Sequence, residues 1–393
     1  MIFRTLSFML CTAILSSPAN AAKPEPTGSP SAIGYQPVGK DEQGLWSQMD
    51  EVERQAKGSR QRVTDPAVTA YVRSVLCRVV SSERCGAIRL YLVRDANFNA
   101  AMAPNGMMIV NTGLLLRMRD EAELAAVLGH EFAHFENRHS LYNHKHLRNS
   151  AGWASWLTVL AAGSGGYRAG IGFFSLFYSA HFSFSREQER NADIEGVKLM
   201  RVSGYRQSAA ADIWAQLIKE RDARALELGL NSSNLAYRGR FASHPADIER
   251  VAYLRAAIDP LGPSTDISSR EVYTRAIAPI WQMMIDDQIK LNDFGGTEFL
   301  LKEIANLEWP PALLVARGDL YRLRGNAGDY ERAISFYREA IALPESPDLA
   351  YRGLGLALAK TGQIPDAQAA LSEFLKRRPD APDKSMLSMI GVN

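Results

Sequence analysis

Apolar and polar residues recur along the chain in patterns that predict a mainly helical protein with a small sheet. Helical spacing occurs at 46–57 and 66–80, and a strand-like segment follows at 88–94. The turn residues 104–106 then separate two extended pieces, and Met107, Met108, Ile109 and Val110 form the second of them. We therefore expect an α+β fold that is mainly helical.

Two later segments carry the residues that start helices. Asp120 with Glu123 has the spacing of a capping box and precedes an apolar run. Ser185 with Gln188 has the same spacing, and Gly204 is well placed to end the helix that begins there. Both segments are predicted to be helices.

Residues 151–180 form two apolar halves separated by glycines and serine at 163–166. Each half is shorter than the roughly twenty residues that a membrane-spanning helix needs. The lengths favour a buried or surface-seated helical hairpin over insertion, and the aromatic content leaves peripheral membrane contact open.

The character of the chain changes after 259–269, which we interpret as a linker. Beyond it, small and aromatic residues recur at an offset of 34 positions: Tyr330, Ala333 and Ala340 are followed by Ile364, Ala367 and Phe374. This period is typical of tetratricopeptide repeats, whose stacked helices present a concave surface to a protein partner. Residues 271–307 are expected to supply a degenerate third unit, and an ordinary helical bundle is the alternative.

The charge balance argues against nucleic-acid binding, and the length predicts more than one domain. The 393 residues include 45 Lys and Arg against 43 Asp and Glu, so the chain has no basic excess with which to bind nucleic acid. The length exceeds that of one typical domain and predicts two domains with separate cores.

The N-terminus predicts export. Arg4 precedes an apolar stretch at 6–15, and small residues lead to Ala21, as in a secretory signal peptide spanning 1–21. Residues 22–45 are rich in proline, glycine and serine, and we expect a flexible leader there. Cys77 and Cys85 remain after cleavage, and an oxidising compartment favours a disulfide between them over two buried thiols.

The candidate chemistry lies in "HEFAH". His130 and His134 are four residues apart, so both imidazoles face one side of a helix and can reach one metal ion. Glu131 lies beside that ion without needing to bind it. For either histidine alone, a hydrogen-bonded core residue is the alternative.

A catalytic zinc needs a third protein ligand and an open position. Glu189 qualifies on a separate helix, with Asp193 one turn later, where it can accept a hydrogen bond from a ligand histidine. Spacing does not exclude Glu187, and a solvated acidic face is the alternative for each glutamate.

These motifs resemble the zinc metallopeptidase family that includes the CAAX prenyl protease and HtpX. The resemblance rests on HExxH at 130–134, ExxxD at 189–193 within "SREQERNAD", "NAAMAPNGMMIV" and "SHPADIER". A signal peptide with C-terminal repeats is similar to the periplasmic branch of this family. The resemblance places a peptidase domain at 46–258 and the repeats at 270–393.

The resemblance implies a role for each motif residue. His130, His134 and Glu189 would bind one Zn2+ per chain, and Glu131 would be the general base. Asp193 would orient a ligand histidine. His244 is either a fourth zinc ligand that must leave before substrate water binds, a transition-state hydrogen-bond donor, or a helix cap.

Other residues receive weaker interpretations. Residues 107–110 are a candidate edge strand to which an extended peptide adds, and a core strand is the alternative. His139, His144 and His146 have irregular spacing, so solvated or capping roles are expected.

The sequence thus predicts a periplasmic zinc endopeptidase whose substrates are misassembled envelope proteins, with repeats that hold substrates or outer-membrane assembly partners. The alternative is a chaperone or assembly factor whose zinc site is structural or locked by His244. The predicted cleavable signal and the short apolar halves disfavour an intramembrane prenyl-protein protease.

Overall fold

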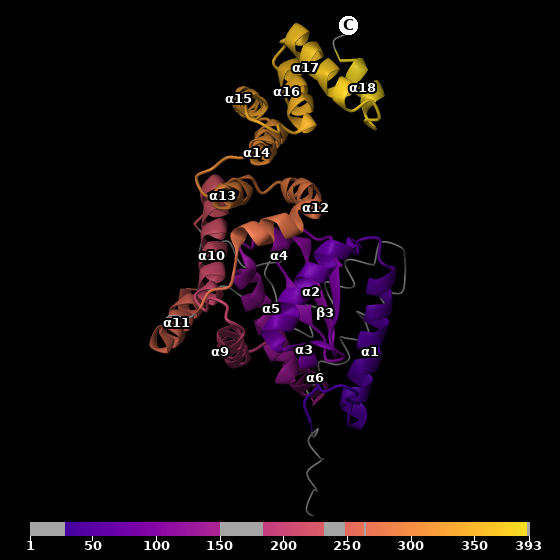
Figure 1. Ribbon diagram of the computed structural model, residues 1–393, viewed down its shortest axis with the longest axis vertical. Coiled ribbons are helices and arrows are strands. Elements are labelled where there is room, and N and C mark those ends of the chain that lie inside the picture. Colours follow the sequence, from indigo (N-terminus) through magenta and orange to yellow (C-terminus); the bar gives the residue numbers. More distant parts are fainter. Residues whose placement is uncertain (1–27, 150–183, 232–247, 263–264, 391–393) are drawn as a thin grey trace, which may run out of the picture.

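A computed structural model describes residues 28–149, 184–231, 248–262 and 265–390 (Figure 1). The predicted signal peptide, the apolar hairpin at 151–180 and His244 lie outside the described residues. No helix in the described ranges has the length and apolar character needed to cross a membrane.

A sheet of three strands lies at the centre of the N-terminal part. Its strands are β1 (Arg89–Val93), β2 (Ala100–Met102) and β3 (Met107–Asn111). Their order is β1-β3-β2, with β1 parallel and β2 antiparallel to β3. The helices of this part are α1 (Gly39–Gly58), α2 (Pro66–Val80), α3 (Ser82–Cys85), α4 (Thr112–Arg117), α5 (Glu121–Glu136) and α6 (His139–Asn149).

Helices cover both faces of the sheet because its strands bear apolar side chains on both sides. On one face α1 contributes Leu45, Met49 and Val52 to a cluster with Tyr91 and Ile109. On the other face Leu92, Met108 and Val110 join the larger core formed with α2 and α5. Figure 1 shows α1 on one side of β3 and α2 and α5 on the other.

The position of β3 corrects one prediction. Residues 107–110 were expected at an edge, yet β3 is hydrogen-bonded to β1 on one side and to β2 on the other, and all five of its residues are buried. Its backbone groups are already paired, so it cannot accept a peptide strand. β3 is the core strand that was the alternative.

The leader is a second correction. Helix α1 begins at Gly39, and the residues before it are bound to the end of α5. Ser29 Oγ donates to Glu136 Oε1 at 2.5 Å, and Arg138 donates to the carbonyl of Gly28 at 2.9 Å and to the hydroxyl of Tyr35 at 2.8 Å. Composition alone suggested flexibility across 22–45, but side-chain hydrogen bonds fix the part that begins at Gly28.

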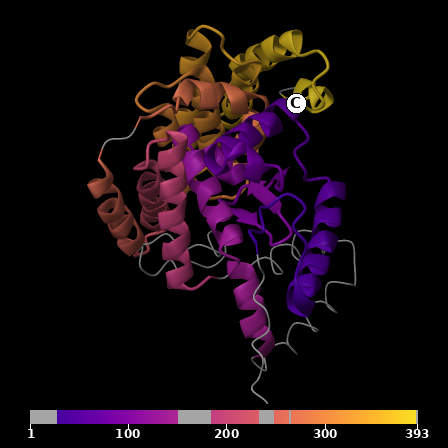
Figure 2. The ribbon, with the colours of Figure 1, turned by 60° about the horizontal axis from the view of Figure 1, so that its bottom comes forward.

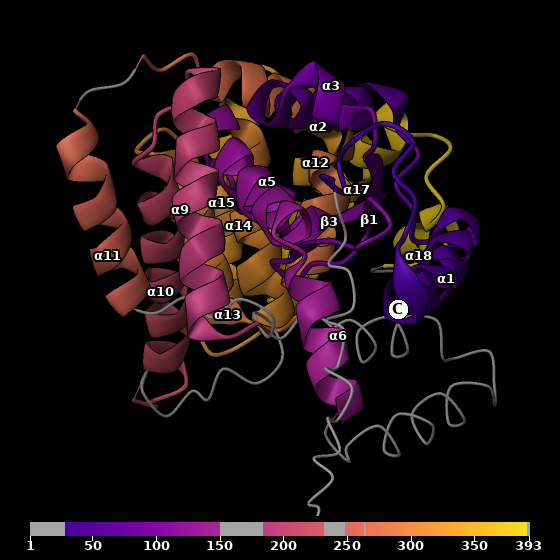
Figure 3. The ribbon, with the colours of Figure 1, turned by 90° about the horizontal axis from the view of Figure 1, so that it is seen from below.

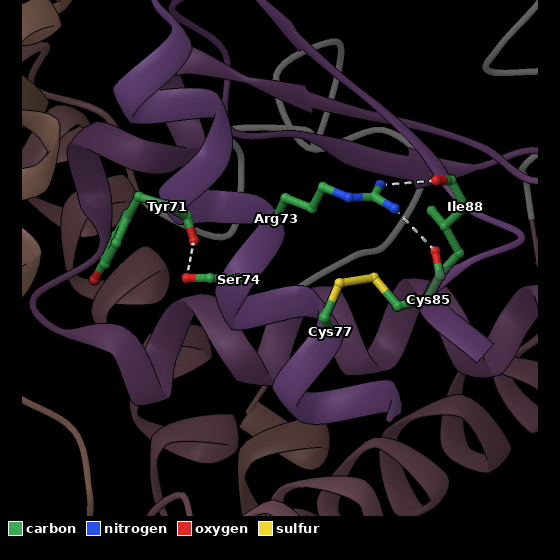
Figure 4. Close-up of a disulfide and its surroundings, with 6 residues drawn as sticks. All are labelled: Tyr71, Arg73, Ser74, Cys77, Cys85 and Ile88. Atoms are coloured by element: carbon green, nitrogen blue, oxygen red, sulfur yellow. Dashed lines mark hydrogen bonds between the residues drawn. A yellow bond between two sulfur atoms is a disulfide. The ribbon is translucent and has the colours of Figure 1, made fainter. Parts of the chain in front are cut away.

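Cys77 in α2 and Cys85 in α3 form a disulfide with a Cα–Cα distance of 5.0 Å (Figure 4). Arg73, one turn before Cys77, donates to the carbonyls of Ile88 at 2.9 Å and Cys85 at 3.3 Å. The disulfide and these hydrogen bonds together fasten α2 to the chain that enters β1.

An ion pair ties α1 to the sheet. Glu53 accepts hydrogen bonds from Arg89 at 2.6 and 2.7 Å and from Tyr91 at 2.7 Å. Burial alone would raise the pKa of Glu53, but these hydrogen bonds lower its pKa to about 2.

Three further helices of the N-terminal part lie in the described ranges. They are α9 (Arg186–Ser203), α10 (Ala209–Glu227) and α11 (Ile248–Ile258), and a 3-10 turn at Asp259–Leu261 follows. Figure 3 shows them side by side, next to α5. Ser185 and Gln188 form the predicted capping box of α9, and left-handed Gly204 ends this helix, so both predictions are confirmed.

The C-terminal part consists of helices at one end of the molecule (Figures 1 and 2). They are α12 (Arg270–Ile289), α13 (Phe294–Ala305), α14 (Pro311–Arg324), α15 (Asp329–Ala342), α16 (Asp348–Lys360), α17 (Ile364–Arg377) and α18 (Lys384–Ser388). Consecutive helices from α13 to α18 pack against each other. Helices α12 and α13 occupy the segment where a degenerate third unit was predicted.

The large core continues past the predicted linker at 259–269. Tyr273, Ile277 and Leu301, from α12 and α13, belong to the same apolar cluster as α2 and α5. Buried Arg117 of α4 donates to Glu220 of α10 and to Gln288 of α12. The first helices after the linker therefore share a core with the N-terminal part, and the domain boundary itself stays a prediction.

Candidate metal centre

The candidate metal centre forms where α5 crosses α9. Gly129 and Gly196 lie at the crossing, and a Cβ on Gly196 would come within 3.2 Å of the backbone nitrogen of His130. The missing side chains let the two helix backbones approach closely. This approach brings Glu189, in the first turn of α9, to the face of α5 that carries His130 and His134.

The three side chains converge on one point. The Nε2 atoms of His130 and His134 are 3.1 Å apart, and Glu189 oxygens lie 3.6 and 3.5 Å from these two nitrogens. Ligand atoms about 2.0–2.1 Å from a tetrahedral zinc lie about 3.4 Å from each other. Two imidazoles and one carboxylate at this spacing fit zinc, and within the described ranges the cluster has three such residues, which leaves the fourth position to a residue outside those ranges or to water.

Burial distinguishes the two candidate glutamates. Glu189 is 6% exposed and belongs to the cluster, whereas Glu187 is exposed on another face of α9. The structure therefore brings Glu189 to the histidines and leaves Glu187 in solvent. Glu131 is buried in α5 directly after His130.

Asp193 holds the ring of His130. Its Oδ1 lies 2.9 Å from His130 Nδ1, so the carboxylate can accept the Nδ1 proton while Nε2 faces the other two candidate ligands. Burial raises the pKa of Asp193, but the charges of Arg250 and His130 outweigh burial and hold this pKa well below its usual range. Asp193 is therefore a carboxylate at any pH at which a zinc site would form.

Arg250 of α11 is a site residue that sequence reasoning missed. It donates from Nε at 2.8 Å and Nη2 at 2.6 Å to the two oxygens of Asp193, and its Nη1 lies 3.3 Å from Glu189. The guanidinium is buried and lies over the ring of Trp214, 3.7 Å from its centroid. One arginine thus fixes the carboxylates of α9. The only signal in the sequence was its place at the end of "SHPADIER".

His139 is a second residue that was missed. Its Nδ1 lies 2.8 Å from His134 Nδ1, and the ring is buried beside Phe184, which stacks on His134 with ring centroids 3.9 Å apart. The expectation that His139 is solvated or capping was therefore wrong. Burial, followed by the charge of His130, lowers the pKa of His139 to about 4. When His134 binds a metal through Nε2, its Nδ1 carries the proton, and a neutral His139 can accept that proton.

The comparisons with known proteins agree with this geometry. Residues 66–258 match peptidase family M48, and residues 326–388 match the tetratricopeptide repeat. The repeat predicted from the period of 34 is thereby confirmed.

Two relatives illustrate the similarity. The mitochondrial metalloendopeptidase OMA1 of Schizosaccharomyces pombe is 30% identical over 196 residues, which are 49% of this chain and 54% of the relative. The beta-barrel assembly-enhancing protease of Escherichia coli is 25% identical over 230 residues, 56% of this chain and 45% of the relative. The chain thus spans about half the length of these relatives. With the site and the matches taken together, the chain carries a peptidase family M48 domain followed by a tetratricopeptide repeat region.

Proposed function

We propose that this chain is a zinc-dependent endopeptidase. The observation that carries the proposal is the convergence of His130, His134 and Glu189 at the mutual spacing of zinc ligands, within an M48 peptidase domain. The orienting partners support it, because Asp193 and His139 hold the two imidazoles with their Nε2 atoms facing inward.

Each residue has a defined part in hydrolysis. Zinc, when bound, polarises the scissile carbonyl and lowers the pKa of water. Glu131 takes the proton of the attacking water on its carboxylate and delivers it to the departing amine. Asp193 keeps His130 in one tautomer, and Arg250 holds Asp193 and Glu189 in place.

The proposed substrates are misfolded or misassembled proteins of the cell envelope, with the repeats holding a substrate or an assembly partner. The predicted signal peptide and the disulfide support an oxidising compartment, and we place the protein in the periplasm. The name of the Escherichia coli relative, a beta-barrel assembly-enhancing protease, supports outer-membrane assembly as the process served. Peripheral membrane contact through 151–180 remains part of the proposal.

The role of His244, which lies outside the described ranges, and the alternative function belong together in this proposal. His244 is either a fourth zinc ligand that leaves before catalysis or a hydrogen-bond donor to the transition state. If His244 stays on the metal, the chain acts as an assembly factor with a locked site, which is the alternative function.

The test is cleavage of casein by the purified chain, with bound zinc measured in parallel. We expect Glu131→Gln to abolish cleavage while keeping zinc, and Glu189→Gln to lose both. Glu187→Gln is the matched control, because this glutamate is exposed and should change neither. His244→Ala should raise activity if that histidine is an inhibitory ligand.

Cleavage that persists in Glu131→Gln would refute the mechanism. Zinc retained without cleavage in every form, including His244→Ala, would favour an assembly factor whose zinc site is structural, because the lock by His244 is absent from that variant.

A further inference from the structure

The outer edge of β1 has a short gap in its hydrogen bonding. Arg89 N donates to Gly106 O at 2.9 Å in the parallel ladder with β3, so Arg89, Tyr91 and Val93 direct their backbone groups toward β3. The backbone groups of Leu90 and Leu92 consequently point away from the sheet.

Neighbouring segments occupy the two ends of this edge. At one end Val63 N donates to Leu92 O at 2.9 Å, and Arg94 N donates to Gln61 O at 2.7 Å. At the other end Arg73 donates to the carbonyl of Ile88 at 2.9 Å (Figure 4). Between them, the N–H and C=O of Leu90 have no hydrogen-bond partner among the residues that the structure describes.

This gap lies in a surface cleft of about 360 Å³. Its walls are the edge of β1, the arm at 62–64 and the first turns of α2, with Arg62, Val63, Thr69, Ala70, Arg73 and Leu90 among the lining residues. The volume is within the range of binding sites for small ligands. A few residues of a bound segment can therefore enter the cleft and reach the backbone of Leu90.

The charge of the cleft is positive. Arg62 and Arg73 line it, and neither forms an ion pair with a carboxylate in the described ranges. Nearby arginines of β1 and its end are paired, Arg89 with Glu53 and Arg94 with Asp287. Arg73 is held by two carbonyls, so its charge is fixed at one end of the cleft.

We propose that this cleft binds a short acidic segment of another protein, whose backbone pairs with Leu90 in the gap at the outer edge of β1. The acidic side chains of the segment face Arg62 and Arg73. The backbone pairing with Leu90 supplies part of the affinity, while the side-chain charges supply selectivity.

The cleft is separate from the metal centre. β1 is divided from β2 by the whole of β3, and it is β2 that contacts α5. Binding at β1 therefore does not require hydrolysis and can be measured in a chain that cannot cleave its ligand. Loss of peptide binding at β1 would contradict this proposal alone, and loss of hydrolysis would contradict the peptidase proposal alone.

The probe is a fluorescein-labelled nonapeptide that alternates valine and glutamate, titrated by anisotropy into the full chain carrying Glu131→Gln. Two matched peptides accompany it, one with lysine replacing glutamate and one with alternate backbone amides N-methylated. We expect saturable binding of the first peptide alone, and slower hydrogen exchange at 88–92 in its presence.

The variant Arg62→Glu should weaken binding about tenfold or more, because it reverses one of the two charges that face the peptide. Arg60→Glu is the control: Arg60 is exposed, lies two residues away and does not line the cleft, so its effect should stay below about twofold. Equal binding of the N-methylated or lysine peptide, an equal effect of both variants, or no binding up to about 1 mM would overturn the proposal.

Discussion

Arg250 offers the sharpest test of how the metal centre is built. The variant Arg250→Met keeps an apolar stem of similar length but removes the guanidinium that holds both oxygens of Asp193. Both side chains of this pair are 3% exposed, so the carboxylate that remains is buried without its main partner. Breaking a buried pair from one side costs about 3–5 kcal/mol. The variant should therefore lose a large share of the stability of a typical domain, which is about 5–15 kcal/mol.

The assay is urea unfolding of the metal-free chain, followed by circular dichroism. Adding Asp193→Asn to Arg250→Met should recover part of the loss, because an uncharged amide no longer needs the guanidinium and still accepts the proton of His130. The control is Arg186→Met, since its pair with Glu249 has side chains 91% and 75% exposed and should contribute about 0–1 kcal/mol.

An Arg250→Met variant within about 1 kcal/mol of the wild type would refute the reasoning, because a buried carboxylate without its arginine would then be tolerated in this core. The same conclusion would follow if the double variant were less stable than Arg250→Met. Zinc affinity, measured by competition with a chelator, should fall about 10–100-fold in the single variant.

Three further predictions concern stability. Replacing Cys77 and Cys85 by serine opens a loop whose ends are eight positions apart. The loss of this crosslink should lower the free energy of unfolding by about 2.6 kcal/mol, measured by denaturant unfolding. An unchanged unfolding midpoint would contradict the loop-entropy argument. Glu53→Gln should lower the free energy of unfolding at neutral pH. The pKa of Glu53 in the folded protein, about 2, lies below its usual value of 4.5, so the difference in stability between wild type and variant should shrink as the pH falls from about 4.5 toward 2. A difference in stability that does not depend on pH would contradict this prediction. Gly353→Ala places a Cβ against the buried ring of Tyr337 and should cost about 1–3 kcal/mol in thermal unfolding. An unchanged melting temperature would show that the ring moves aside at no cost and would contradict this prediction.

Local patterns predicted the elements that carry the site. Asp120 Oδ1 accepts from Glu123 N at 3.0 Å at the start of α5, where the spacing placed a cap. The four-residue interval between His130 and His134 fixes their common face in any α-helix, so these two candidate ligands follow from the sequence alone. Spacing did not separate Glu189 from Glu187; the family resemblance favoured Glu189, and its burial where α9 crosses α5 now distinguishes the two.

The features that were missed depend on packing between distant segments. Strand order is not encoded in the apolar character of residues 107–110, which suits a central strand as well as an edge. Arg250 and His139 carry ordinary polar signals in the sequence, and their roles arise when α11 and α6 bring them to α9 and α5. The leader was judged by composition, which does not reveal hydrogen bonds to Arg138.

Helix α10 links the candidate metal centre to the first helices of the C-terminal part. Near its start Trp214 supports the arginine of the metal centre, and farther along Glu220, Arg224 and Glu227 are bound to Arg117, Asp293 and Arg324. The contacts with α13 and α14 and the contact of Trp214 with Arg250 therefore lie on one continuous helix. A displacement of the C-terminal helices relative to α10 would have to break ion pairs on the same helix that supports the guanidinium beside Asp193.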